Sequence, residues 1–158
     1  AKAVGCRALV YDYPLAHQAK HPAQLEAAMA AWNWLVDQGF DPRRIVIAGD
    51  SCGAVLTYGV LQRLRAQGRP LPVATLIISG WFDMAMTAAS YETNREKDPA
   101  FAKAGVDRLD VFDGMLHSFQ MMAGRAPEAD DAIARFATWV RPRLGLPAAG
   151  EKTSERAA

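Results

Sequence analysis

The sequence contains little of what marks several large classes of protein. Cysteine occurs only at Cys6 and Cys52, and two thiols without metal-ligand spacing make neither a disulfide framework nor a zinc site. The 18 basic and 17 acidic residues leave a formal net charge of +1, which gives no electrostatic reason to expect nucleic acid as a partner. No apolar run reaches the roughly 18 residues that cross a bilayer. We therefore expect a soluble, cytoplasmic protein without a membrane span or a bound metal.

What the sequence does contain is enough apolar side chain for a core. Hydrophobic residues make up 51% of the 158 positions and charged residues 22%, which is an ordinary balance for a folded domain. This length fits one domain, and we place that domain at residues 1–146. Residues 147–158 (PAAGEKTSERAA) are small and polar, so we expect them to form a disordered tail.

Apolar runs of strand length alternate along the chain with stretches of helical spacing. The short runs predict buried strands at residues 6–10, 44–48, 73–78 and 108–112. The helical spacing predicts three helices, from Pro22 to Gln38, from the nucleophile motif to Gly68, and from Pro127 to Leu144. This alternation indicates an α/β fold with a doubly wound, mostly parallel sheet. No strand pattern occurs between Trp81 and Val106, so one strand segment of the alternation is expected to be missing.

The run at 44–48 leads directly into Gly49-Asp50-Ser51-Cys52-Gly53, a G-x-S-x-G match followed by helical spacing. A serine in a tight strand-to-helix turn is held in a strained conformation, and its hydroxyl projects above the carboxyl edge of the sheet. Small neighbours let such a turn close, and the Cys52 amide at the helix start would stabilise a developing oxyanion. This context favours Ser51 as a nucleophile over the competing interpretation, an ordinary glycine-rich βα turn.

His117 follows the last predicted strand and precedes the last predicted helix. A serine hydroxyl is a poor nucleophile until a base takes its proton, and histidine suits that role near neutral pH. The order serine before histidine is also the chain order of α/β-hydrolases. His117 is therefore the candidate base. His17 and His21 lie in an early polar loop and are predicted to be surface residues.

Several segments together resemble the hormone-sensitive-lipase-like esterase family of α/β-hydrolases. They are ALVYDYPLA (8–16), the helix at 22–39, DPRRIVIAGDSCGA (41–54), RPLPVATLIISGWFDM (69–84) and FDGMLHSF (112–119). The resemblance implies an α/β-hydrolase core in which Ser51 is acylated and His117 acts as general base and acid. It also implies a small-molecule ester substrate and no cofactor. The family motif usually reads GDSAGG, so Cys52 and Ala54 are mild departures.

Other parts of the family pattern are missing from this sequence. The HGGG oxyanion loop belongs upstream of the strand at 6–10, and the sequence begins after that point. The triad acid normally follows a strand well before the histidine, but here DPAF (98–101) runs almost directly into residues 102–112. The amino-terminal cap helices are absent too. We therefore expect a truncated α/β-hydrolase core.

Asp83 follows the apolar run at 73–78 and is the candidate for a substitute triad acid, although the family's matching aspartate is structural. Asp107, Asp110 and Asp113 are closer to His117 in sequence, but none lies in the required loop. The thiol of Cys52 is expected to pack rather than react, and a reactive cysteine at a helix start is the alternative. Core packing is likewise the role predicted for Met115, Met121 and Met122.

Two functional interpretations follow from these residues. The first is a serine carboxylesterase that acts on short acyl esters, which the retention of Ser51 and His117 favours. The second is a non-catalytic hydrolase remnant that binds a ligand or self-associates, which the missing acid segment and oxyanion loop favour. An uncovered sheet edge would promote association, so a homo-oligomer is also expected.

Overall fold

A computed structural model describes residues 1–80, 82, 110, 112 and 114–148. Its helices are α1 (Ala23–Asp37), α2 (Cys52–Ala66) and α4 (Pro127–Val140), and its strands are β1 (Val46–Asp50) and β2 (Ala74–Ile78). Three short 3-10 turns are η1 (Pro42–Arg44), η2 (Phe119–Met122) and η3 (Pro142–Leu144). The three predicted helices and the strand predictions at 44–48 and 73–78 are therefore confirmed within a few residues. Gly39, two residues after the end of α1, has a φ of +84°, a left-handed conformation that suits glycine and ends the helix.

The two strands are parallel neighbours joined by a helix. Val46 of β1 pairs with Ala74 of β2, and the register continues to Asp50 opposite Ile78. Because β1, α2 and β2 follow one another in the chain, they form a βαβ unit. Both strands consequently end at the same edge of the sheet, and Ser51 and Ser79 lie at this carboxyl edge.

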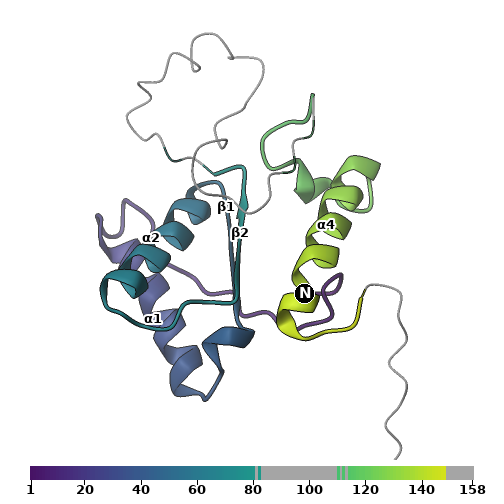
Figure 1. The fold of residues 1–158 in the computed structure, drawn as a ribbon. Helices are drawn as coiled ribbons and strands as arrows, with labels where there is room; N and C mark the ends of the chain where they lie inside the picture. Colours follow the sequence, from purple (N-terminus) through teal and green to yellow (C-terminus); the bar gives the residue numbers. More distant parts are fainter. Residues whose placement is uncertain (81, 83–109, 111, 113, 149–158) are drawn as a thin grey trace, which may run out of the picture.

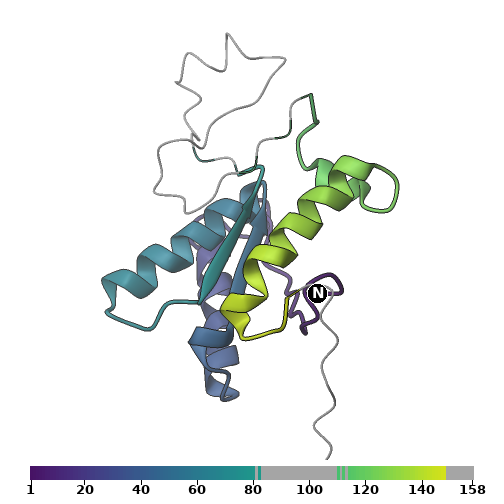
Figure 2. The ribbon, with the colours of Figure 1, turned by 45° about the vertical axis from the view of Figure 1, so that its right-hand side comes forward.

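Helices cover both faces of the strands. Figure 1 shows α1 and α2 on one side of β1 and β2 and α4 on the other, and the turned view of Figure 2 agrees. Successive side chains of β1 point to opposite faces of the sheet. Ile47 packs against buried residues of α1 and α2, whereas Val46 packs against buried residues of α4. This is the side-chain alternation of a strand buried on both sides.

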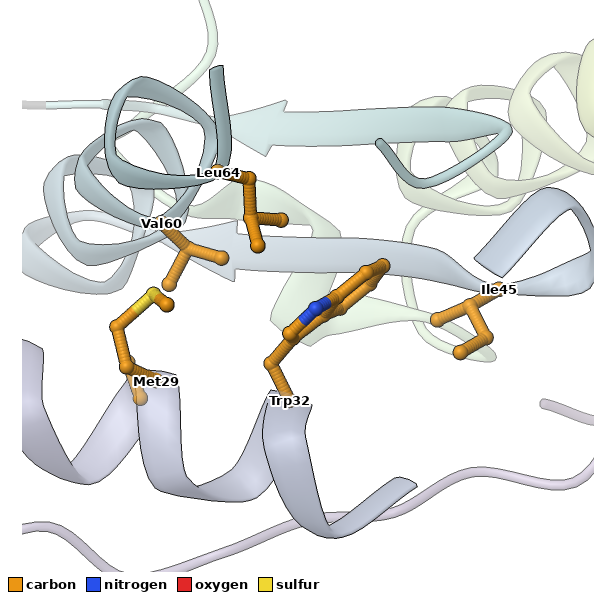
Figure 3. Packing of buried hydrophobic residues seen from close by; sticks show 6 residues of the cluster. Met29, Trp32, Ile45, Val60 and Leu64 are labelled. Atoms are coloured by element: carbon orange, nitrogen blue, oxygen red, sulfur yellow. The ribbon is translucent and has the colours of Figure 1, made fainter. Parts of the chain in front are cut away.

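The larger core cluster joins α1 and α2 to the first face of the strands. Figure 3 shows Met29, Trp32, Ile45, Val60 and Leu64 converging there. The smaller cluster on the other face combines Val4, Ala74, Ala137 and Val140. Arg141 reinforces it by donating a hydrogen bond of 2.7 Å from Nη1 to the Val4 carbonyl. The amino-terminal residues are thus fixed beside the end of α4 (Figure 1).

The strand predicted at residues 6–10 is wrong, because this segment is irregular. A strand exists only where a neighbour supplies ladder hydrogen bonds, and no strand in the described part of the chain pairs with this segment. Its apolar side chains are correspondingly open, with Val10 88% exposed. Of the strand predicted at 108–112, Asp110 and Phe112 are described and neither belongs to a strand. The rest of that segment, the region 83–106 and residues 149–158 of the expected tail lie outside the described residues.

Candidate active site

Ser51 forms the whole connection between β1 and α2. Asp50 ends the strand, Cys52 begins the helix, and Ser51 has φ 55° and ψ −119°. A non-glycine residue in so sparsely populated a region costs roughly 1–3 kcal/mol and persists only where the surroundings fix it. The backbone N–H of Ser51 donates a 2.9 Å hydrogen bond to the Ile78 carbonyl, so the end of β2 helps to hold it. The predicted strained strand-to-helix turn is therefore confirmed.

Gly49 makes this turn sterically feasible. A Cβ at this position would lie 2.1 Å from the Gly53 carbonyl oxygen and 2.6 Å from Thr57 Oγ1, distances that no real contact reaches. Gly53 differs, because a Cβ there would meet none of the described atoms within 4 Å. The expectation that small neighbours close the turn thus holds for Gly49. At this position the backbone of β1 lies directly against the backbone of α2.

The structure brings Ser51 and His117 together from positions 66 residues apart. Ser51 Oγ and His117 Nε2 are 3.0 Å from each other, a normal distance for a hydrogen bond between a hydroxyl and an imidazole. Ser51 is half-buried and His117 is exposed, so solvent and a small molecule can reach the pair. With Nε2 as the unprotonated nitrogen, the hydroxyl donates its proton toward the ring, which is the first step of serine activation.

A second set of hydrogen bonds links the same two segments. The Ser118 hydroxyl lies 2.8 and 2.9 Å from the two carboxylate oxygens of Asp50. The Ser118 backbone N–H donates a 3.0 Å hydrogen bond to Ser79 Oγ. Sequence reasoning placed Asp50 in the nucleophile motif but gave Ser118 no role. The only signal available was its position directly after the candidate base.

Cys52 does not pack as expected, because its side chain is exposed. The start of α2 lies at the open carboxyl edge of the sheet, where no described element covers the thiol. The Tyr13 hydroxyl is 3.6 Å from Cys52 Sγ, and either atom can be the donor. This hydrogen bond, together with burial, raises the pKa of Tyr13 above its usual value.

The methionines beside His117 are also more open than predicted. Met115, Met121 and Met122 are all exposed, and Met121 is 82% exposed. They lie on the His117 loop and on η2, and although η2 packs against α4, these three side chains remain exposed. Together with Leu116, they leave exposed apolar side chains in the chain segments that flank the histidine, and they do not form a core.

The remaining candidate residues divide into described and undescribed positions. His17 and His21 are exposed, as predicted for surface residues. Asp110 forms an ion pair of 3.6 Å with Arg135 of α4. Asp83, Asp107 and Asp113 lie outside the described residues. Within the described part, no group of three or more metal-binding side chains occurs, and no helix is long and apolar enough to cross a membrane.

Comparison with known proteins matches this geometry. The sequence model of the alpha/beta hydrolase fold family matches residues 1–112. The chain is 38% identical over 107 residues to an acetyl-hydrolase of Streptomyces hygroscopicus, an alignment that covers 68% of this chain and 36% of that protein. It therefore spans about a third of the length of the curated relatives it matches.

Solved structures agree over a larger share of the chain. An esterase from the bacterial hormone-sensitive lipase family superposes with a TM-score of 0.82 at 32% identity, over 92% of this chain and 68% of that one. EstE5, in a crystal soaked with p-nitrophenyl butyrate, superposes with a TM-score of 0.80 at 28% identity, over 91% of this chain and 68% of that one. The chain belongs to the alpha/beta hydrolase fold family and, within it, to the bacterial hormone-sensitive lipase family.

Proposed function

We propose that this protein is a serine carboxylesterase that hydrolyses short acyl esters through an acyl-enzyme on Ser51. The observation that carries the proposal is the 3.0 Å between Ser51 Oγ and His117 Nε2, at a turn that holds the serine at a positive φ of 55°. A hydroxyl and an imidazole at this distance form the arrangement of a nucleophile with its general base.

The chemistry follows from these two groups. His117 Nε2 accepts the Ser51 proton while Oγ attacks the ester carbonyl carbon, and a tetrahedral oxyanion forms. The Cys52 N–H in the first turn of α2 has no intrahelical partner and is available to stabilise this charge. When the intermediate collapses, the leaving alcohol takes the proton from the imidazolium. Water activated by the same imidazole then attacks the acyl-serine and releases the carboxylic acid.

The surroundings of the pair suit small apolar acyl groups. Leu116 directly precedes His117 in the chain and Met121 follows it by four residues, and both expose apolar surface. Burying such surface against an acyl chain is favourable. The relatives support the same substrate class, since one is named an acetyl-hydrolase and another was soaked with p-nitrophenyl butyrate. Short acyl esters are therefore the substrates assigned here.

A carboxylate that orients the histidine completes the proposal, and Asp83 is assigned as this substitute acid. Asp83 comes shortly after β2 in the sequence, and β2 ends at the edge where Ser51 lies. In the serine protease example, loss of the orienting acid lowers kcat by about 10⁴-fold. Asp83→Asn is expected to reduce hydrolysis strongly while labelling of Ser51 stays detectable. An unchanged kcat would remove Asp83 from the mechanism.

Hydrolysis of p-nitrophenyl butyrate tests the proposed function. Wild type is expected to hydrolyse the ester above background, and Ser51→Ala is expected to abolish this activity. Thr138→Ala, which removes an exposed hydroxyl on α4, is the matched control and is expected to retain it. A folded protein that binds esters without turnover, unaffected by Ser51→Ala, would instead support the non-catalytic remnant.

A further inference from the structure

A second bridge runs beside the bond between Ser51 and His117. The hydroxyl of Ser118 donates to the Asp50 carboxylate at 2.8 and 2.9 Å, because an ionised carboxylate only accepts. Asp50 directly precedes Ser51, and Ser118 directly follows His117. The bridges Ser51–His117 and Asp50–Ser118 therefore join the same two chain segments at adjacent residues. The Asp50–Ser118 bridge has a charged acceptor, and hydrogen bonds of this kind are stronger than those between neutral groups.

Ser118 is also attached to the other strand. Its backbone N–H donates a 3.0 Å hydrogen bond to Ser79 Oγ, and Ser79 directly follows β2. The loop that carries His117 is thus tied through one residue to the ends of both β1 and β2. Ser118 is only 8% exposed, whereas His117 is exposed. The buried residue can therefore anchor the exposed one.

The backbone of Ser118 points to the same role. Its φ of 56° and ψ of 32° are left-handed, a conformation that non-glycine residues avoid unless their surroundings impose it. Ser79, its partner, also has a positive φ of 44°. Hydrogen bonds through both the N–H and the hydroxyl of Ser118 fix the orientation of the peptide that joins it to His117.

We propose that Ser118 and Asp50 are positioning residues that keep His117 Nε2 within hydrogen-bond distance of Ser51 Oγ. The inference rests on the proposed function, in which His117 is the base. Neither residue is assigned contact with the substrate. Their contribution is to limit the motion of an exposed loop whose histidine must be aligned with the serine during proton transfer.

The test compares Ser118→Ala in two backgrounds. In the otherwise wild-type protein, Ser118→Ala is expected to lower kcat for p-nitrophenyl butyrate by about ten- to a hundredfold, the range for loss of one hydrogen bond to a charged group. The KM is expected to stay within a few-fold. In the His117→Ala background, the same change is expected to have no further effect, because there is no base left to position. Thr138→Ala serves as the hydroxyl-deletion control.

Two variants of Asp50 sharpen the comparison. Asp50→Ala is expected to resemble Ser118→Ala, and the double variant to lose little more than either single one, since both changes remove one bridge. Asp50→Asn keeps an acceptor oxygen for the Ser118 hydroxyl and is expected to recover much of the lost rate. An equal loss of kcat in Asp50→Asn and Asp50→Ala would overturn the positioning role. So would an equal effect of Ser118→Ala on kcat in the wild-type and His117→Ala backgrounds.

A measurement without turnover separates this inference from the proposed function. The ring ¹⁵N resonances of His117 report its hydrogen bonding, and Ser118→Ala is expected to shift them toward those of a free histidine while Thr138→Ala leaves them unchanged. If these resonances shift but wild type has no activity dependent on Ser51, the proposed function fails and the positioning survives. If wild type is active and Ser118→Ala changes neither kcat nor the resonances, the positioning fails alone.

Discussion

At the scale of single residues, the site depends on backbone conformations that cost free energy. Ser51, Ser79 and Ser118 all have positive φ, and all three lie at the carboxyl edge of the two strands. Strain gathered at one place and held by hydrogen bonds is typical of a functional site. The motif predicted the strain at Ser51, but not that of Ser79 and Ser118, since nothing local in their sequence requires it.

Replacing the exposed thiol separates the role of its side chain from that of its backbone. Cys52→Ala keeps the N–H in the first turn of α2 and is expected to leave the esterase rate within a few-fold of wild type, as measured with p-nitrophenyl butyrate. A loss of about a hundredfold or more in a folded variant would show that the thiol itself takes part in the chemistry.

At the scale of elements, the sequence predicted helices better than strands. Apolar spacing within a helix is local, so the pattern in 23–37 identifies α1 and the faces it buries. A strand needs a partner distant in sequence, and the apolar run at 6–10 therefore has strand composition without strand pairing. The same reason explains the exposed methionines, because an apolar residue is buried only where another element covers it.

The β1 to α2 turn allows a matched pair of glycine substitutions. Gly49→Ala is expected to lower the free energy of unfolding by about 1–3 kcal/mol, because the new Cβ would overlap the Gly53 backbone. Gly53→Ala places a methyl in open space within a helix, where alanine is favoured by up to about 1 kcal/mol. Urea unfolding followed by circular dichroism measures both. An equal free energy of unfolding for the two variants would contradict the close approach of the Gly49 and Gly53 backbones.

At the scale of the whole molecule, stability depends on the two clusters that attach helices to the strands. Leu64, 0% exposed, is among the largest fully buried side chains described. Leu64→Ala is expected to cost about 2–5 kcal/mol of unfolding free energy. Leu71→Ala removes the same atoms from a side chain that is 44% exposed and is expected to cost much less. Equal losses in chemical denaturation would contradict the core assigned here.

The open apolar surface predicts self-association. In the described part of the chain, β1 pairs only with β2, while Val10, Trp34, Leu116 and Met121 expose apolar surface. Uncovered edges and apolar patches favour contacts between copies. Light scattering is expected to give a mass that rises with concentration above 17.2 kDa. A constant monomer mass would disprove this expectation.

The central claim is that Ser51 is a nucleophile activated by His117, and covalent labelling tests it most directly. A fluorophosphonate probe is expected to form one adduct, on the tryptic peptide 45–63 that contains Ser51. Mass spectrometry is expected to find no adduct in Ser51→Ala and much slower labelling in His117→Ala. An adduct at another residue that persists in Ser51→Ala, or a labelling rate unchanged by His117→Ala, would contradict the account.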